Sequence, residues 1–269
     1  MDDGISFVVR IRNEEETLEQ SVRSLFRIRV PCEILLILHL CTDRSKEIAT
    51  RLAAERSNVR VFEYNTPVSR PGYETLCTDK DSPHSLSTYY TTCYNEAWYP
   101  WKFKWDADFI ATDGLVEYIN SCGWCRDTTK SHELYMHAES PDGTSNCERY
   151  IVSGDIKFDK YWFWEVVSLP EPIVKIGTDV KITHFSKLSA KKSYWNHVPW
   201  FLDREYLKAH PEHYDEAITV LGRYIKLIEI CGLEPHAQAR ASNPESTPIF
   251  TKVIANEDVL RSVGINSAL

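Results

Sequence analysis

Two carboxylates separated by a single residue, Asp106-Ala107-Asp108, are the pattern in this sequence that points most directly to chemistry. In an extended segment, residues i and i+2 point to the same side, so both carboxylates can face one ligand. Paired carboxylate oxygens suit Mg²⁺ or Mn²⁺, and such an ion is commonly shared with a diphosphate. A D-x-D pattern also occurs at solvated turns, so its meaning depends on the element that leads into it.

That element is a predicted strand. Trp101 to Trp105 is a short segment rich in aromatic residues, and it places both aspartates at its carboxyl end. Further strands are predicted over 5–11, 33–38 and 58–64, and helices over 43–56, 84–98 and 114–122. Another helix is expected between the first two strands, with Asn13 as its N-cap and Glu16 at the N3 position of a capping box. Strands that alternate with helices favour an α/β fold with a mostly parallel sheet.

Ligands of such sheets bind outside the carboxyl ends of the strands. The loops after Ile11, Leu38 and Tyr64 are therefore expected to share a site with the two aspartates. The second half of the chain differs from the first: it predicts strands over 133–138, 148–152 and 173–185, turns at 141–143 and 153–155, and an amphipathic helix over 213–231.

The bulk properties exclude several classes of protein. The net charge is -8 and no long basic run exists, which argues against a nucleic-acid partner. No run of 18 apolar residues is present, and the acidic Met1-Asp2-Asp3-Gly4 start lacks a signal-peptide pattern. We therefore expect a soluble cytoplasmic protein without a transmembrane segment. Cys122 and Cys125 form the only close cysteine pair and have no second pair at zinc spacing, so structural thiols are favoured over a redox or zinc site.

The order of these pieces resembles the nucleotide-binding half of family 2 glycosyltransferases, over residues 5–63 and 84–121. A first strand followed by N-E-E is found in VVRIRNEE (8–15), the Leu-x-x-Ser helix pattern in LEQSVRSL (18–25), and the D-x-D in 106–108. The family's second strand ends in E-I-[IV]-[IV]-V-D-D-G-S-T-D. This chain has EILLILHLCTD (33–43) in that place, so Leu38-His39 stand where the family has an Asp pair.

The resemblance implies a GT-A (nucleotide-diphospho-sugar transferase) fold, with a mostly parallel central sheet flanked by helices and a smaller mixed acceptor-side region. It also implies a catalytic domain over 1–232, divided into a nucleotide-binding half (1–121) and an acceptor half (122–232). Residues 233–269 would then be a C-terminal extension.

The resemblance further implies a set of ligands for the metal and the nucleotide. Asp106 and Asp108 would form the metal site, with Asp106 also near the donor ribose or sugar. Because GT-A enzymes often supply a late histidine, His184 would be a further metal ligand, although a lone histidine is more often structural.

Three residues are implied in nucleotide binding. The end of the first strand contacts nucleotide in this family, so Arg10 and Arg12 are candidates, since guanidinium groups suit stacking and bidentate contacts. The alternative is that these arginines extend along the sheet edge to water. His39 occupies the position of the family's base-binding Asp, and it can still donate or accept one hydrogen bond.

An inverting transferase also needs a carboxylate base near the acceptor hydroxyl. The family places this base downstream of the D-x-D. Glu165, which follows the aromatic run Tyr161 to Trp164, is the leading candidate and Asp155 is the second, with Asp159 and Asp142 as further competitors. The alternative is a structural aromatic segment from which Glu165 faces solvent.

The sequence thus predicts a glycosyltransferase of the hexosyltransferase type that depends on Mn²⁺ or Mg²⁺. It would move a sugar from a nucleotide-diphosphate donor, with a UDP-sugar favoured and a GDP-sugar possible, to a glycan or other hydroxyl acceptor with inversion. Two alternatives stay open. One is a non-catalytic nucleotide- or sugar-binding GT-A relative, motivated by the missing Asp pair. The other is a sugar-nucleotide nucleotidyltransferase, although that class normally has a Gly-rich loop where this chain has Arg-Asn-Glu-Glu.

Overall fold

A computed structural model describes residues 4–69, 78–121, 130–139, 145–161 and 164–184 of the chain. The chain divides into two compact units. The first contains the described residues within 4–66, 90–157 and 167–184, and the second contains those within 67–89 and 158–166. The candidate metal and nucleotide ligands all belong to the first unit, whereas Glu165 belongs to the second.

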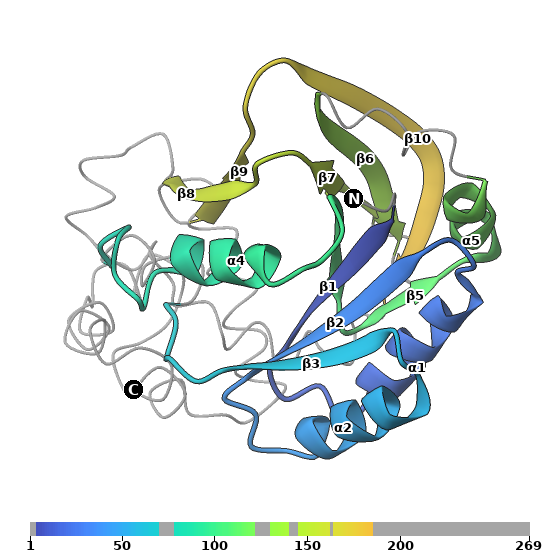
Figure 1. Ribbon diagram of the computed structural model, residues 1–269, viewed down its shortest axis with the longest axis vertical. Helices are drawn as coiled ribbons and strands as arrows, with labels where there is room; N and C mark the ends of the chain where they lie inside the picture. The colour runs from blue at the N-terminus through green and yellow to red at the C-terminus, as the bar shows by residue number, and fades with distance from the viewer. Residues whose placement is uncertain (1–3, 70–77, 122–129, 140–144, 162–163, 185–269) are drawn as a thin grey trace, which may run out of the picture. The chain divides into compact units, whose positions relative to one another are not determined.

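The first unit is built on a curved sheet (Figure 1). Its strands are β1 (Ile5–Ile11), β2 (Cys32–His39), β3 (Val59–Tyr64), β4 (Trp101–Asp106), β5 (Phe109–Ala111), β6 (Ser131–Glu139), β7 (Ser145–Ser153) and β10 (Ile173–His184). They lie in the order β3-β2-β1-β4-β7-β6-β10-β5. The pairs β3–β2, β2–β1, β1–β4 and β6–β10 are parallel, whereas β4–β7, β7–β6 and β10–β5 are antiparallel. The predicted α/β class, with a mostly parallel sheet and a mixed second half as a GT-A fold implies, is confirmed.

Helices flank this sheet. They are α1 (Leu18–Ser24), extended by the 3-10 turn η1 (Leu25–Arg27), α2 (Ser45–Glu55), α4 (Leu86–Asn95) and α5 (Asp113–Asn120). Figure 1 shows α1 and α2 along one side of β1, β2 and β3, with α4 on the other side. A separate two-stranded sheet pairs β8 (Lys157–Tyr161) with β9 (Trp164–Ser168).

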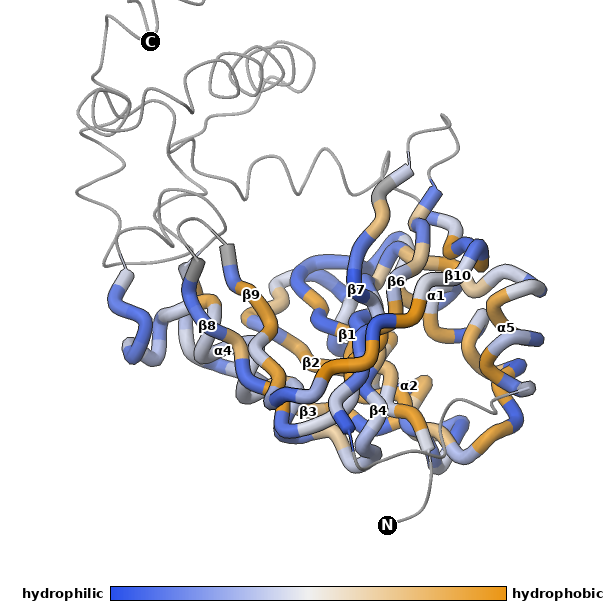
Figure 2. The backbone as a smooth tube through the Cα atoms, turned by 90° about the horizontal axis from the view of Figure 1, so that it is seen from above, coloured by the Kyte–Doolittle hydropathy of each residue, from blue (hydrophilic) through white to orange (hydrophobic). Residues whose placement is uncertain are grey.

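An aromatic cluster fills the core beneath the D-x-D motif. Phe7 of β1 stacks on Phe103 of β4 at 5.3 Å between ring centroids, and Trp105 meets Phe103 edge-on at 5.2 Å and Phe109 at 5.6 Å. All four rings are buried. Aromatic pairs add about 0.5–1.5 kcal/mol each beyond the burial of their area, so the backbone on both sides of Asp106 is held firmly. Figure 2 shows the hydrophobic stretches of the chain along the central strands.

The expected strands and helices of the first 121 residues are all present. The N-cap prediction for Asn13 is wrong, because α1 begins only at Leu18 and Thr17 is its N-cap residue. Asn13 has a φ of 59°, in the left-handed region that asparagine tolerates. Its side chain accepts a hydrogen bond from the Thr42 amide in the loop after β2 instead. The strands β5, β8 and β9 were not predicted.

Other predictions lie outside the described residues. These are the helix over 213–231, the turn at 141–143, the pair Cys122/Cys125, and Asp142. The boundaries at 121, 232 and 269 stay predictions. In the described part of the chain, no helix is both long and apolar enough to cross a membrane.

Candidate active site

The candidate site lies along one edge of the sheet. Because β1, β2, β3 and β4 are parallel neighbours, their carboxyl ends meet at this edge, with Arg10 opposite Asp106 and His39 opposite Tyr64 in the register. The strand β10 runs in the same sense, since it is parallel to β6, which is antiparallel to β7, which is antiparallel to β4. His184, the last residue of β10, therefore comes to the same edge. The prediction that this edge gathers the loops after β1, β2 and β3 is confirmed.

Asp106 ends β4 and is partly exposed, with 35% of its side chain accessible. Its Oδ1 accepts a hydrogen bond from Nη2 of Arg10 at 3.1 Å. On the other face of the sheet, Nε1 of Trp105 donates to Oγ of Ser21 at 2.9 Å, and that hydroxyl donates to the Asp106 carbonyl at 3.4 Å. These contacts hold the backbone and the carboxylate of Asp106 from opposite faces.

Asp108 lies against His184. Nε2 of His184 and Oδ2 of Asp108 are 3.0 Å apart, and their side chains are 29% and 7% exposed. The contact arises because His184 pairs with Phe109, the residue after Asp108, in the β10–β5 register. Burial lowers the pKa of His184, but the hydrogen bond and charge of Asp108, together with the charges of Asp106 and Glu148, raise it overall. The imidazole therefore sits in a negative field, which also favours a cation.

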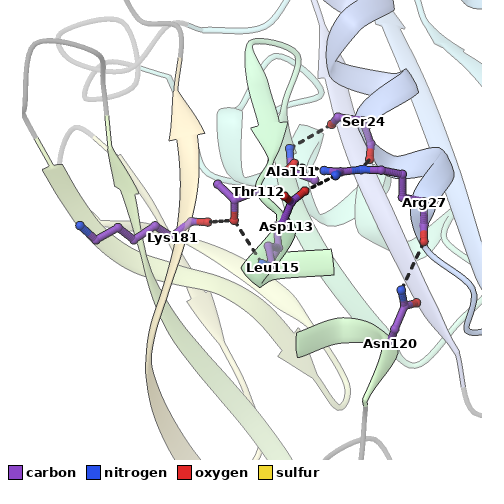
Figure 3. Close-up of polar contacts among 8 residues, drawn as sticks. All are labelled: Ser24, Arg27, Ala111, Thr112, Asp113, Leu115, Asn120 and Lys181. Carbon is purple, nitrogen blue, oxygen red and sulfur yellow. Dashed lines mark hydrogen bonds and ion pairs between the residues drawn. The ribbon is translucent and has the colours of Figure 1, made fainter. Parts of the chain in front are cut away.

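A polar network holds this contact in place (Figure 3). Thr112, the N-cap of α5, accepts from the Leu115 amide at 3.1 Å and donates to the Lys181 carbonyl of β10 at 2.7 Å. Arg27 donates to the Ala111 carbonyl and pairs with Asp113, while its own carbonyl accepts from Asn120. The segment from β5 to α5 is thereby fastened to β10 on one side and to η1 on the other, which fixes the positions of Asp108 and His184.

The three predicted metal ligands are brought to one edge but not into one cluster. Within the described ranges, no group of three or more His, Cys, Asp or Glu side chains is arranged to hold a metal ion. Asp108 and His184 are in contact and could both ligate a metal ion, whereas the Oδ1 atom of Asp106 faces Arg10. A carboxylate oxygen beside an imidazole nitrogen fits Mn²⁺ better than Mg²⁺, which binds mainly oxygen ligands.

His39 lies at the end of β2 and is buried, with 5% of the residue exposed. A carbonyl can only accept, so Nε2 of His39 carries the proton that it donates to the Thr66 carbonyl at 3.0 Å. Burial, and then the charge of Arg12, lower the pKa of His39 to about 4, against the effect of the Thr66 hydrogen bond. His39 is therefore neutral at physiological pH, and Arg12 lies close enough to act on it electrostatically.

The loops after β1 and β2 are bound to each other. Oδ1 of Asn13 accepts from the Thr42 amide at 2.7 Å, and the Glu15 amide donates to Oδ2 of Asp43 at 3.0 Å. The Glu14 amide donates to Oγ of Ser45 at 2.8 Å. The N-E-E segment of the motif thus serves to join the two loops that carry Arg12 and His39.

The ion pair of Lys104 and Glu148 was not found by sequence reasoning. Nζ of Lys104 lies 2.6 Å from Oε2 of Glu148, and the charge of Glu148 reaches both His184 and Tyr150. Strand alternation would have placed Lys104 on the same face as Asp106, two residues later. Glu148 could not have been placed, because its position depends on the pairing of β7 with β4.

The two candidate bases belong to different units. Asp155 follows the end of β7, and Ser153 pairs with Trp101 at the start of β4, so Asp155 lies at the edge of the sheet opposite Asp106. The structure does not bring Asp155 to the candidate site. Glu165 lies on β9 in the second unit and is partly buried, and Asp159 lies on β8 of the same small sheet.

Neither a protein-family model nor a curated protein matches this sequence. Among solved structures, the chain is similar to S. aureus TarS 1-349 in complex with UDP, with 13% identity, a TM-score of 0.49, and coverage of 97% of this chain and 90% of that one. It is also similar to the mannosyltransferase PcManGT from Pyrobaculum calidifontis in complex with GDP-Man and Mn²⁺, with 11% identity, a TM-score of 0.44, and coverage of 95% and 86%. For GalNAc-T7 with UDP, GalNAc and Mn²⁺ the values are 15%, 0.36, 63% and 30%. At these identities the similarity concerns the general course of the chain alone.

Proposed function

We propose that this protein is a metal-dependent glycosyltransferase that moves a sugar from a nucleotide-diphosphate donor to an acceptor hydroxyl. The observation that carries the proposal is the edge of the sheet where Asp106 meets Arg10 and Asp108 meets His184, at 3.1 Å and 3.0 Å. Carboxylates alone would repel a diphosphate, so a site of this composition calls for a cation between protein and ligand. The same edge carries Arg12 and His39, which can recognise the nucleoside.

In this proposal Asp108 and His184 hold Mn²⁺, and Asp106 orients the donor. When bound, the ion supplies positive charge that stabilises the departing diphosphate. Arg12 binds the nucleotide as a cation, and the neutral His39 lines the nucleoside pocket. The loop junction at Asn13 keeps these two side chains in place before the donor arrives, so that little ordering is needed on binding.

Glu165 is proposed as the base. The acceptor oxygen attacks the anomeric carbon, the bond from that carbon to the diphosphate oxygen breaks, and the acceptor proton passes to the carboxylate of Glu165. A single displacement of this kind inverts the configuration at the anomeric carbon. By the family resemblance a hexose on UDP is the favoured donor, with GDP second.

A panel of UDP, GDP, CDP and TDP with and without Mn²⁺, read by thermal unfolding, tests the proposal. A nucleotide present at 100 times its Kd stabilises the fold by about 2.7 kcal/mol. For a chain of this size that is a rise in Tm on the order of 5 to 10 °C. We expect the rise only together with Mn²⁺, and we expect it to be largest with UDP and next largest with GDP. Equal shifts in Tm in EDTA and in Mn²⁺ would show that nucleotide binding does not need the metal ion, which contradicts this part of the proposal.

Asp108→Asn is the matching variant, since the amide keeps the size of a side chain that is 7% exposed. We expect the fold to persist and the Mn²⁺-dependent shift to disappear. Asp179→Asn, an exposed position on β10, is the control for the substitution itself. Slow hydrolysis of the donor by wild type distinguishes a transferase from a binding module, which would bind without turnover. If Asp108→Asn keeps the full shift, the Asp108–His184 pair is not the metal site.

A further inference from the structure

Arg10 is a charged residue inside a central strand. It lies on β1 between β2 and β4, and its side chain is 11% exposed. It does not extend to water along the sheet edge, as one interpretation of the sequence allowed. Instead it stands in register opposite Asp106 on the same face of the sheet, and its Nη2 atom reaches Oδ1 of Asp106 at 3.1 Å.

Tyr90 covers the guanidinium group. The Cζ atom of Arg10 lies 3.8 Å from the centroid of the Tyr90 ring, which is itself 9% exposed. A planar guanidinium can stack on an aromatic ring and donate in its plane at the same time, which an ammonium cannot do. The ring therefore limits the orientations of the guanidinium group, from which Nη2 reaches Asp106.

A second cation on this face, Lys104, bonds to a different carboxylate. Lys104 precedes Asp106 by two residues on β4, but its Nζ atom is held by Glu148 at 2.6 Å. Burial lowers the pKa of Lys104, and the charges of both Asp106 and Glu148 raise it overall, but among the described residues only Arg10 donates a hydrogen bond to the Asp106 carboxylate. In the described part of the chain, Oδ1 is the only side-chain atom of Asp106 that makes a hydrogen bond, and the side chain is 35% exposed.

We propose that Arg10 is a positioning residue that holds Oδ1 of Asp106 so that Oδ2 is presented to the donor. This rests on the proposed function, and it replaces the direct nucleotide contact that the sequence predicted for Arg10. The carboxylate would otherwise rotate about its terminal torsion, which is broad for aspartate. The ion pair also offsets one of the two negative charges that the D-x-D places close together.

A double-mutant cycle with Arg10→Met and Asp106→Asn tests this, with binding of UDP or GDP in Mn²⁺ measured by calorimetry. We expect each single variant to weaken binding by about ten-fold, and the double variant to bind no more than about two-fold weaker than either single one, because coupled residues are non-additive. Arg10→Lys should fall well short of wild type, since it cannot keep both the stacking and the bond. Arg23→Met, which breaks exposed ion pairs to Glu19 on α1 and Glu55 on α2, is the matched control and should bind as wild type does.

The outcomes separate the two proposals. If wild type binds no nucleoside diphosphate in Mn²⁺, the proposed function fails and the role of Arg10 falls with it. If wild type binds but the two single effects multiply in the double variant, Arg10 acts independently of Asp106 and only the positioning role is overturned. An unaffected Arg10→Met variant also overturns it. Metal-free urea unfolding of each variant shows whether it is folded, and if Arg10→Met is not, the same cycle is run with Arg10→Lys.

Discussion

The buried His39 makes the stability of the protein depend on pH in a way that one substitution can isolate. Its pKa falls from 6.5 to about 4 in the folded protein, first because of burial and then because of the charge of Arg12. Between these two values the unfolded chain binds a proton that the folded chain does not. Stability is therefore fully present above pH 6.5 and is lost as the pH falls towards 4.

The size of the effect follows from the two pKa values. For this one group, linkage predicts a loss of about 1.4 kcal/mol at pH 5.5 and about 2.6 kcal/mol at pH 4.5, relative to neutral pH. His39→Gln removes the titration while its amide can still donate to the Thr66 carbonyl, which accepts from His39 at 3.0 Å. The variant should therefore keep most of its stability at pH 7.5 and lose less than wild type on acidification.

Urea unfolding of wild type and His39→Gln at pH 7.5, 5.5 and 4.5 measures this directly. Other groups titrate in both proteins, so the informative quantity is the difference between their free energies of unfolding at each pH. We expect that difference to shift in favour of the variant by the amounts given above. His137→Gln on β6 controls for the exchange of residue type. A difference that stays constant from pH 7.5 to 4.5 would show that His39 is not held in its neutral form by the fold.

Two further predictions concern the base and the anchoring of the site. Glu165→Gln should retain binding of nucleotide with Mn²⁺ and lose transfer by a factor on the order of 10² to 10⁴, because a base acts on the acceptor and not on the diphosphate; unchanged activity per folded molecule would show a structural carboxylate. Thr112→Val should lower the free energy of unfolding by about 1 to 2 kcal/mol, since both hydrogen bonds of the hydroxyl are lost, whereas Thr112→Ser should keep most of it. Equal urea midpoints for the Val and Ser variants would mean that the cap does not hold β10 to α5.

Much of the first half of the fold was predictable because its signals are local. The buried strands β1 and β2 are mainly apolar, whereas β4 alternates buried aromatic residues with lysines, and the pleat alone determines which residues share a face. The start of α1 was misassigned for a reason that no local pattern contains. Asn13 has a side chain that suits an N-cap, but its side-chain oxygen Oδ1 accepts a hydrogen bond from the amide of Thr42, which lies 29 residues later in another loop. A tertiary partner thus displaced a plausible local one.

In the candidate site, too, some residues follow from local sequence signals and others depend on tertiary structure. Asp106 and Asp108 follow from spacing and strand alternation, and they come to the expected edge. The partners of these aspartates depend on strand order instead. Arg10 meets Asp106 only because β1 and β4 are neighbours in parallel register, and His184 meets Asp108 only because β10 pairs with β5. Asp155 illustrates the reverse case, since the antiparallel course of β7 carries it to the opposite edge.

Leu38-His39, which stand where the resembled glycosyltransferase motif has an Asp pair, are best understood together with Arg12. An Asp at the end of β2 would bring a negative charge that accepts hydrogen bonds. The neutral His39 brings no charge, and its Nε2 proton is already donated to the Thr66 carbonyl. A positive Arg12 nearby lowers the pKa of His39 further, so the positive charge beside the end of β2 comes from Arg12. In the proposed site, this charge would favour a nucleotide held by its phosphate or ribose over one selected through a carboxylate contact to its base. We therefore expect only weak discrimination between UDP and GDP, and the nucleotide panel proposed above compares the two.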